Sequence, residues 1–403
     1  MGEYLIKHET LADMADALRE ILGTQQNYSA DRMAEAIREI SSLQDSVPQG
    51  VAQEAARVMQ SLGEKKGKNC VTFIAMSDMH AYGPGELTDA GISDLYRSSI
   101  QNAGMGAAII AQEMQPDFLV NLGNLAGSNS ETSLRQGLDA LVQVRQDLAK
   151  AEEIVPYFRV PGNRDTLSFS IGKNGEYLQP NLLAALVGDY DFQDLEDKKV
   201  RLIFLNTADN RGHTLTGNTN TERISPEQLQ WFAETIDLSG KDAPEEWRIL
   251  LYAHHPLDWG PIRPAADCLA AYLDGASYEV EHEGTVIQYD FTGKNAARIV
   301  AQFHGHTHCF KVDAIRDHRS GEAVPTCVKR IAIPNVSFHR TNELGTLERY
   351  GLVYGETQTY EKDSAKPEKS TSFCLVAVDL EAETVYADCF GAGYDREIPW
   401  RDA

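Results

Sequence analysis

The sequence predicts an α/β protein with a separate helical segment at its N-terminus. Short apolar runs alternate with helical stripes from residue 69 onward, and the first three runs are Val71–His80, Asp117–Leu122 and Ile154–Val160. Strands and helices in this order predict a parallel sheet with right-handed crossovers. Polar residues follow directly after these runs, and the carboxyl ends of parallel strands are where loops converge in such folds. We therefore expect a functional site at the strand ends.

Residues 1–66 are expected to form short amphipathic helices. Apolar residues recur at helical spacing in three stripes, which are Leu11, Met14, Leu18 and Ile21, then Met33, Ile37 and Ile40, then Val51, Ala55, Val58 and Leu62. Helices this short bury little surface alone, so we expect a helical arm that docks on a partner or self-associates. LADMADALREILG and YSADRMAEAIREI resemble small helical modules of phage and prophage tail-associated proteins. The rest of the chain, 69–403, is expected to be one domain.

Composition and charge exclude several classes of function. No apolar run is long enough to cross a membrane, and the N-terminus lacks the basic start and apolar core of a secretory signal, which predicts a cytoplasmic protein. A net charge of -23 repels nucleic acids and anionic membranes, so neither is an expected partner. The six cysteines form no C-x-x-C pair, which predicts reduced thiols.

The second half of the domain contains further elements. Three more strands are expected at Val200–Asn206, Trp247–Ala253 and Arg298–Phe303. Ser225 begins a capping box with proline at the first helical position, which predicts a helix from residue 226. The alternation in Phe373–Asp379 and Thr384–Phe390 predicts a hairpin that closes a second sheet. Specificity is expected to lie in three loops, at 208–223, 257–292 and 340–371.

Five strand ends carry polar clusters that suit a metal centre. The clusters are Asp78-x-His80, Gly123-Asn124, Gly162-Asn163-Arg164-Asp165, His254-x-Pro256 and Gly305-His306-x-His308. A single histidine at a strand end is more often structural, but five clusters after five apolar runs are hard to explain by chance. Asp, Asn and His side chains together suit divalent ions such as Mn, Fe or Zn. The glycines let the backbone turn sharply beside a ligand.

The order of these clusters resembles that of the calcineurin-like metallophosphoesterases, whose pattern is D-x-H, G-D, G-N-H-[DE], H and G-H-x-H. The resemblance extends over roughly residues 69–398. It implies a four-layer α/β/β/α sandwich with two divalent metal ions, either Mn, Fe, Zn or Ni, at the strand ends. It further implies hydrolysis of a phosphomonoester, phosphodiester or pyrophosphate by a metal-activated water. The implied substrate is a phosphorylated small molecule or a phosphodiester.

The resemblance also implies, position by position, which residues would bind the metals. One set is Asp78, His80 and His308, and the other is Asn163, His254 and His306, with Asn124 at the position that bridges both. His254 is preferred over His255 because the ligand in the family precedes a proline by two residues. His255 and His213 are candidates for substrate binding. The alternatives are that His255 packs beside its neighbour and that His213 lies in a solvated loop.

Arg164 is the first departure from the family pattern, which usually has histidine there. Arginine retains a positive charge for the phosphoryl oxygens, and the same G-N-R-D occurs in the similar lipid A precursor pyrophosphatases. Arginine cannot protonate a poor leaving group, so activated esters or pyrophosphates are the expected substrates. We therefore predict Arg164 and Asp165 as catalytic residues, with Asp165 either orienting Arg164 or capping a turn.

Asn124 is the second departure, because the family has an aspartate that bridges the two metals. An amide offers one neutral carbonyl oxygen in place of two anionic ones, and Asp78 becomes the only anionic side chain among the implied ligands. The occupancy of at least one metal site is expected to fall, so the protein is expected to bind either two ions or only one. Two functions follow, which are a metal-dependent phosphoester hydrolase and a catalytically impaired, virion- or prophage-associated binding protein.

Overall fold

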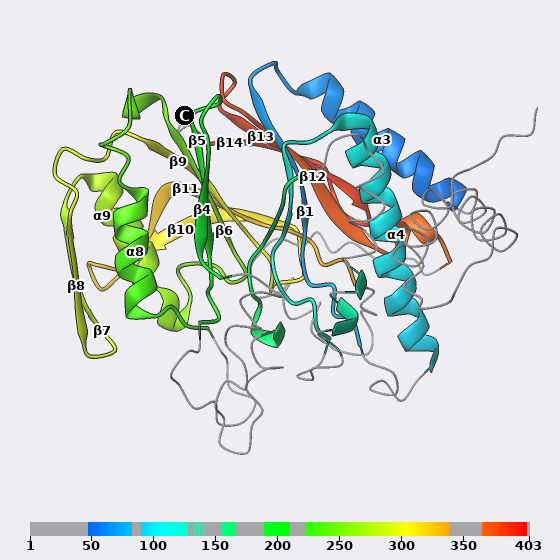
Figure 1. The fold of residues 1–403 in the computed structure, drawn as a ribbon, viewed down its shortest axis with the longest axis horizontal. Helices are drawn as coiled ribbons and strands as arrows, with labels where there is room; N and C mark the ends of the chain where they lie inside the picture. Colours follow the sequence, from blue (N-terminus) through cyan, green and yellow to red (C-terminus); the bar gives the residue numbers. More distant parts are fainter. Residues whose placement is uncertain are drawn as a thin grey trace, which may run out of the picture.

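Two sheets lie face to face at the centre of the molecule, and helices cover the outer face of each (Figure 1). This computed structural model describes residues 47–82, 90–127, 155–165, 189–209, 222–337 and 365–400, with helical residues 133, 135–137 and 139–140. The order of the layers is the predicted four-layer α/β/β/α sandwich. The first two predicted N-terminal helices and His213 lie outside the described residues.

The first sheet has the strand order β14-β13-β12-β1-β2-β3. Its strands are β1 (Cys70–Met76), β2 (Phe118–Asn121), β3 (Tyr157–Arg159), β12 (Ser372–Asp379), β13 (Thr384–Gly391) and β14 (Arg396–Pro399). The first three strands run parallel, as predicted. The C-terminal hairpin also forms, but the prediction that it closes a second sheet is wrong, because β12 pairs antiparallel with β1. Every residue of β12 is buried, which fits a strand in the middle of this sheet.

The second sheet has the strand order β10-β11-β9-β6-β5-β4. Its strands are β4 (Asp191–Leu195), β5 (Val200–Leu205), β6 (Arg248–Ala253), β9 (Arg298–His304), β10 (Lys311–Asp317) and β11 (Val324–Ala332). Three of them, β5, β6 and β9, confirm the strands predicted from their apolar runs, and they run parallel. The other three were not predicted, because they lie toward the edges and carry charged, half-exposed residues.

Helices cover both outer faces of the sandwich. α3 (Gln49–Lys65) and α4 (Ala90–Met114) pack on the first sheet, while α8 (Pro226–Ile236) and α9 (Pro264–Asp274) pack on the second. Three short 3-10 helices are η1 (Pro244–Glu246), η2 (Gly260–Ile262) and η3 (Pro367–Lys369). The Ser225 side chain accepts the backbone N–H of Gln228, which confirms the predicted cap of α8. Within the described residues, no helix combines the length and apolar character that a bilayer span requires.

The stretch 257–292 is not a loop, contrary to the prediction. It contains η2, α9 and the hairpin of β7 (Ser277–His282) and β8 (Thr285–Asp290). The apolar side chains of Leu269 and Tyr272 in α9 are fully buried against the second sheet. The buried apolar face of a short helix in this stretch was not recognised in the sequence.

The third predicted N-terminal stripe lies in α3 and packs on the chain itself. Its members, Val51, Ala55, Val58 and Leu62, are fully buried in one cluster with residues of α4 and β13. This helix therefore has its partner within the same chain. The division of the chain at residue 66 and the docking role of the preceding residues stay predictions.

Alternating residues of β1 enter two different cores. Phe73 faces the space between the sheets, where its ring stacks on Phe118 at 4.9 Å and meets Phe303 of the other sheet edge-on at 5.1 Å. Ile74 and Met76 face α3 and α4. The strand is thus fixed on both faces, which holds its carboxyl end in place.

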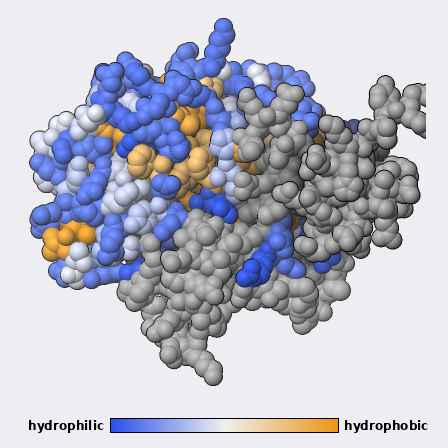
Figure 2. All heavy atoms as spheres, in the orientation of Figure 1, coloured by the Kyte–Doolittle hydropathy of each residue, from blue (hydrophilic) through white to orange (hydrophobic). Residues whose placement is uncertain are grey.

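The exposed surface is in keeping with the strongly acidic composition. Figure 2 shows hydrophilic residues over much of one face, interrupted by smaller apolar areas. The large apolar residues that are exposed in the described parts are Phe192, Val286, Val324 and Tyr394. They come from separate parts of the chain.

Candidate metal centre

The five polar clusters of the sequence come together where β1, β2, β3, β6 and β9 end. Backbone hydrogen bonds join the loops that carry them. The N–H of Asp78 donates to the carbonyl of Gly123, and the N–H of His80 donates to that of Asn124, both at 3.0 Å. On the second sheet, the N–H of Gly305 donates to the carbonyl of His254 at 3.1 Å. The loops therefore form one connected unit.

Asp78, His80 and His308 form the first of two clusters of possible ligands. The Nε2 atoms of His80 and His308 lie 3.4 and 3.2 Å from Asp78 Oδ1, and 3.0 Å from each other. The other oxygen of Asp78, Oδ2, accepts the Ser77 hydroxyl at 2.6 Å and the backbone N–H of His306 at 2.8 Å. Two imidazoles and one carboxylate are a set that suits a transition metal such as iron.

His254, His255 and His306 form the second cluster, in which one ring nitrogen of each lies within 4.8 Å of the other two. His254 Nδ1 lies 2.6 Å from the Leu122 carbonyl oxygen and therefore carries the proton, so its Nε2 has a free lone pair. That Nε2 faces Asn163 Oδ1 at 3.1 Å. His254 Nε2 and Asn163 Oδ1 both offer a lone pair, and two ligands of one cation lie at about this separation. The two side chains therefore fit a metal site.

The structure thus brings together all seven residues that the resemblance implied as ligands. His306 and His308 are two residues apart on one loop and belong to different clusters, so the two clusters are neighbours. His255, predicted for substrate binding, lies in the second cluster. Whether these residues bind metal and substrate stays a prediction.

Five of these residues have a left-handed backbone, which side chains other than glycine adopt rarely. They are Asp78, His80, Asn124, His306 and His308, with φ between 48° and 65°. Such conformations cost about 1–3 kcal/mol each and concentrate at functional sites. Half of the ten described non-glycine residues with positive φ therefore lie in the loops of this centre.

Two glycines allow the loops to approach each other closely. A Cβ on Gly162 would lie 2.3 Å from the backbone N of Asn124, and one on Gly305 would lie 1.8 Å from the Ser77 hydroxyl oxygen. Both distances are far below van der Waals contact, so any larger residue would separate the two loops concerned. The glycines that precede the predicted ligands therefore serve close approach of the loops.

Asn124 does not direct its carbonyl oxygen at a ligand position. Its Oδ1 accepts the backbone N–H of Arg164 at 2.9 Å, and its Nδ2 donates to Asp78 Oδ1 at 3.0 Å. These two bonds fix the orientation of the amide, because reversing it would place like groups against each other. The side chain acts here as a hydrogen-bonded link between the first and third motifs.

Asp165 is fully buried and binds backbone groups. Its carboxylate accepts the N–H groups of Asn124, Ala126 and Gly162 at 2.9–3.0 Å. These contacts tie the loop after β2 to the loop after β3 and agree with the predicted alternative of a turn cap. The prediction that it orients Arg164 stays untested.

Burial favours the neutral form, which is the form that binds metals, for four histidines of the centre. Burial lowers the pKa of His80 to about 4 despite the Asp78 carboxylate beside it, and burial also lowers the pKa values of His254, His255 and His306. Burial alone would raise the pKa of Asp78, but the neighbouring histidines, chiefly His308 and His254, hold it well below its usual range. The site therefore presents the Asp78 carboxylate beside four imidazoles that burial keeps neutral.

Metal-free protein is expected to lose stability as the pH falls from about 6.5 to about 5. Burial places the pKa of His80 at about 4 and that of His304 at about 3, so the unfolded chain binds more protons over this range. Asp165 opposes this loss, because burial raises its pKa to about 6. At about 1.4 kcal/mol per pKa unit, these groups predict a net loss of about 2–3 kcal/mol by pH ~5.

Urea unfolding of chelator-treated protein at a series of pH values measures this loss. A free energy of unfolding that stays constant between pH ~7.5 and pH ~5 would contradict the prediction.

Three residues of the centre were missed by sequence reasoning. Ser77 holds the Asp78 carboxylate, Thr207 binds the His255 ring and backbone, and the Trp259 ring lies 5.7 Å from the His306 ring. Ser77 could have been found because it adjoins the first motif. Thr207 follows β5 and Trp259 follows Pro256, but neither carries a chemical signal in the sequence.

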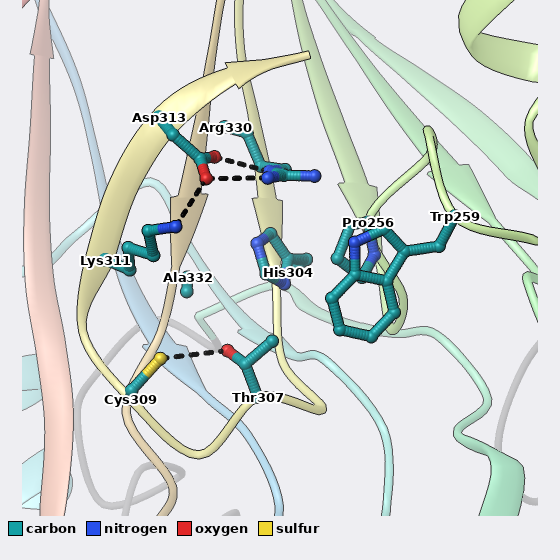
Figure 3. Close-up of a pocket in the computed structure, with 9 residues that line it drawn as sticks. All are labelled: Pro256, Trp259, His304, Thr307, Cys309, Lys311, Asp313, Arg330 and Ala332. Carbon is teal, nitrogen blue, oxygen red and sulfur yellow. Dashed lines mark hydrogen bonds and ion pairs between the residues drawn. The ribbon is translucent and has the colours of Figure 1, made fainter. Parts of the chain in front are cut away.

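A pocket lies beside the loop that carries His306 and His308 (Figure 3). It is lined by Pro256, Trp259, His304, Thr307, Cys309, Lys311, Asp313, Arg330 and Ala332. Lys311 and Arg330 both pair with Asp313, and Arg330 also pairs with Asp258, so the charges around this pocket are largely balanced. Trp259 lies on the opposite side of His304 from Lys311, as the figure shows.

The family model of the calcineurin-like phosphoesterases matches residues 71–310, which is more than half of the chain. The chain therefore belongs to this family of metal-dependent phosphoester hydrolases. The matched region contains all five motifs and both clusters of possible ligands. No match is found among curated proteins.

Several solved structures are similar to the chain at low identity. A structure of PhoD is 11% identical, covers 84% of this chain and 68% of its own, and has a TM-score of 0.39. A 5'-nucleotidase precursor from Thermus thermophilus is 12% identical over 82% of this chain and 54% of its own, with a TM-score of 0.34. The Thermus thermophilus sulfate thiohydrolase SoxB, in complex with glycerol, is 12% identical over 82% and 56%, with a TM-score of 0.34. The chain spans just over half the length of the last two.

Proposed function

We propose that this chain hydrolyses phosphoesters at the centre formed by the two clusters. The observation that carries the proposal is that His306 and His308, on one loop, each join a different cluster of possible metal ligands. Two metal positions side by side are the arrangement that displacement at phosphorus uses. We assign Asp78, His80 and His308 to one position, and His254, His306 and Asn163 to the other.

A bound divalent ion, either Mn, Fe, Zn or Ni, would supply a water of lowered pKa and bind phosphoryl oxygens. Asp78 would hold the only side-chain negative charge among the ligands, and its two hydrogen bonds through Oδ2 fix its orientation. The backbone contacts of Asp165 would keep the loops after β2 and β3 in register, so that Asn163 faces His254.

Arg164 would bind the phosphoryl oxygens of the substrate. Its backbone N–H donates to Asn124 Oδ1, and the amide nitrogen of Asn124 donates to Asp78 of the first cluster. A guanidinium does not give up a proton near neutral pH, so the leaving group must depart without one. The substrates proposed are therefore activated phosphomonoesters, phosphodiesters or pyrophosphates of small molecules in the cytoplasm.

Activity assays on metal-stripped protein, reloaded with Mn²⁺ or Zn²⁺, test this proposal. We expect turnover of p-nitrophenyl phosphate, bis-p-nitrophenyl phosphate or a pyrophosphate, and its loss with a chelator. Arg164→Ala is expected to lower kcat by about 10²-fold with unchanged metal content, and Arg164→Lys to recover part of the loss. No turnover of any of these compounds by fully loaded protein would overturn the proposal.

The orientation of Asn124 favours a second candidate function. Because its amide nitrogen faces Asp78, the position that bridges the metals in the family offers no anion here. A chain of this kind could bind a phosphorylated ligand without hydrolysing it, in a prophage or virion setting to which the N-terminal helices would attach it. Binding of a phosphate compound without turnover, even after metal loading, would support this candidate.

A further inference from the structure

His255 is a buried histidine with one ring nitrogen unaccounted for. It has no exposed surface, and its Nε2 has no hydrogen-bond partner. An unpaired polar atom in the interior costs about 1–3 kcal/mol, so such atoms are rare without a reason. The three rings of the second cluster contact one another, and the His255 ring lies 4.7 Å from that of His254 and 4.4 Å from that of His306.

The hydrogen bonds of Thr207 explain which nitrogen is available. Its hydroxyl oxygen accepts the backbone N–H of His255 at 3.0 Å and lies 3.0 Å from the Nδ1 of the same residue. The oxygen has a second lone pair, so it can accept an Nδ1–H as well. The Nε2 atom would then present a bare lone pair, the form in which imidazole binds metals when its other nitrogen is hydrogen-bonded.

We propose that His255 is a metal ligand in this chain and completes a three-histidine site with His254 and His306. One ring nitrogen of each of the three residues lies within 4.8 Å of one such nitrogen of the other two. Nδ1 of both His254 and His255 is engaged by neighbouring groups, which leaves their Nε2 atoms for the metal. The inference rests on the proposed function for the presence of a metal centre, and it changes the ligands of one of its two positions.

The two positions would then prefer different metals. The first has one carboxylate and two imidazoles, whereas the second has three neutral imidazoles and no anion, because position 124 carries a neutral amide whose Oδ1 accepts the Arg164 backbone N–H. Imidazole ligands suit Zn²⁺, Ni²⁺ and Cu²⁺, while Mn²⁺ and Mg²⁺ favour oxygen. The second position should therefore bind Zn²⁺ in strong preference to Mn²⁺.

Metal titrations of the full chain test the inference without any assay of activity. Chelator-treated protein is loaded with Zn²⁺ or Mn²⁺ and gel-filtered, and its metal content is measured by elemental analysis. The Zn²⁺ affinities are measured by competition with a chelating dye. We expect about two Zn²⁺ but about one Mn²⁺ per chain, and at least a ~100-fold weaker second Zn²⁺ site in His255→Gln.

His304→Gln is the matched control, because His304 is also buried and neutral but belongs to neither cluster. It should retain both Zn²⁺ sites. If His255→Gln does not fold, Thr207→Val serves in its place, with an expected ~10–100-fold loss of Zn²⁺ affinity at the second site. Folded His255→Gln or Thr207→Val protein with wild-type Zn²⁺ affinity would overturn the inference. Zinc binding as expected without turnover would overturn the proposed function alone.

Discussion

Replacing Asn124 by aspartate is expected to raise the Mn²⁺ content from about one to about two ions per chain and turnover by about 10²-fold or more. The amide nitrogen of Asn124 lies 3.0 Å from the Asp78 carboxylate, inside a buried site. A carboxylate there would add a second negative charge that only a cation can balance at so short a distance. The same change should therefore strengthen metal binding and destabilise the metal-free protein.

Thermal unfolding with and without Mn²⁺ measures both effects in one experiment. Without metal, Asn124→Asp should unfold at a lower temperature than wild type, because two carboxylates repel each other and the hydrogen bond to Asp78 is lost. With Mn²⁺ at ~100-fold above Kd, it should gain about 3 kcal/mol.

Asn124→Ala is the control that removes the amide without adding a charge. It should lose stability in both conditions and gain neither metal nor turnover. An Asn124→Asp protein that behaves like Asn124→Ala would show that the missing bridge is not what limits the site.

Whereas the sandwich was implied by the family resemblance, most of the strands beneath the site could be predicted because buried strands carry continuous apolar runs. β1, β5, β6 and β9 are of this kind. β4 and β10 escaped prediction because their half-exposed residues mix with charged ones, and their pairing depends on distant neighbours. The pairing of the C-terminal hairpin with β1 also depends on residues far apart in the sequence. Both faces of β12 are buried, so its residue pattern does not indicate which strand it pairs with.

The residues of the site were predicted from the sequence, but their relative positions and contacts were not. Spacing along the chain identified Asp78, His80, His306 and His308, yet their left-handed backbone appears only in the folded loops. The role of Asn124 as a link to Arg164 also depends on a contact across two loops. The family resemblance set His254 above His255, because the ligand in the family precedes a proline by two residues, whereas the structure places both rings beside that of His306.

Replacing Asp78 by asparagine is expected to have the largest effect of any single change at the site. Asp78 is the only carboxylate in either cluster, and its Oδ1 lies within 3.4 Å of the Nε2 atoms of His80 and His308. Without its charge, the affinity of the first position for Mn²⁺ should fall by at least about 10²-fold, and turnover by about 10³-fold. Elemental analysis of reloaded protein and kcat on an activated ester measure the two losses.

Asp165→Asn separates a ligand role from a structural one. Asp165 is equally buried, but its partners are backbone N–H groups of the loops after β2 and β3. In Asp165→Asn the amide nitrogen would face those N–H donors, which should lower the free energy of unfolding by about 1–3 kcal/mol. The metal content per folded chain should stay that of the wild type. The Asp78 carboxylate likewise only accepts hydrogen bonds, from Ser77, Asn124 and His306. Asp78→Asn should therefore lose a similar amount of stability and should also lose its metal ion. Equal metal content in the two variants would show that the Asp78 charge does not hold a metal ion.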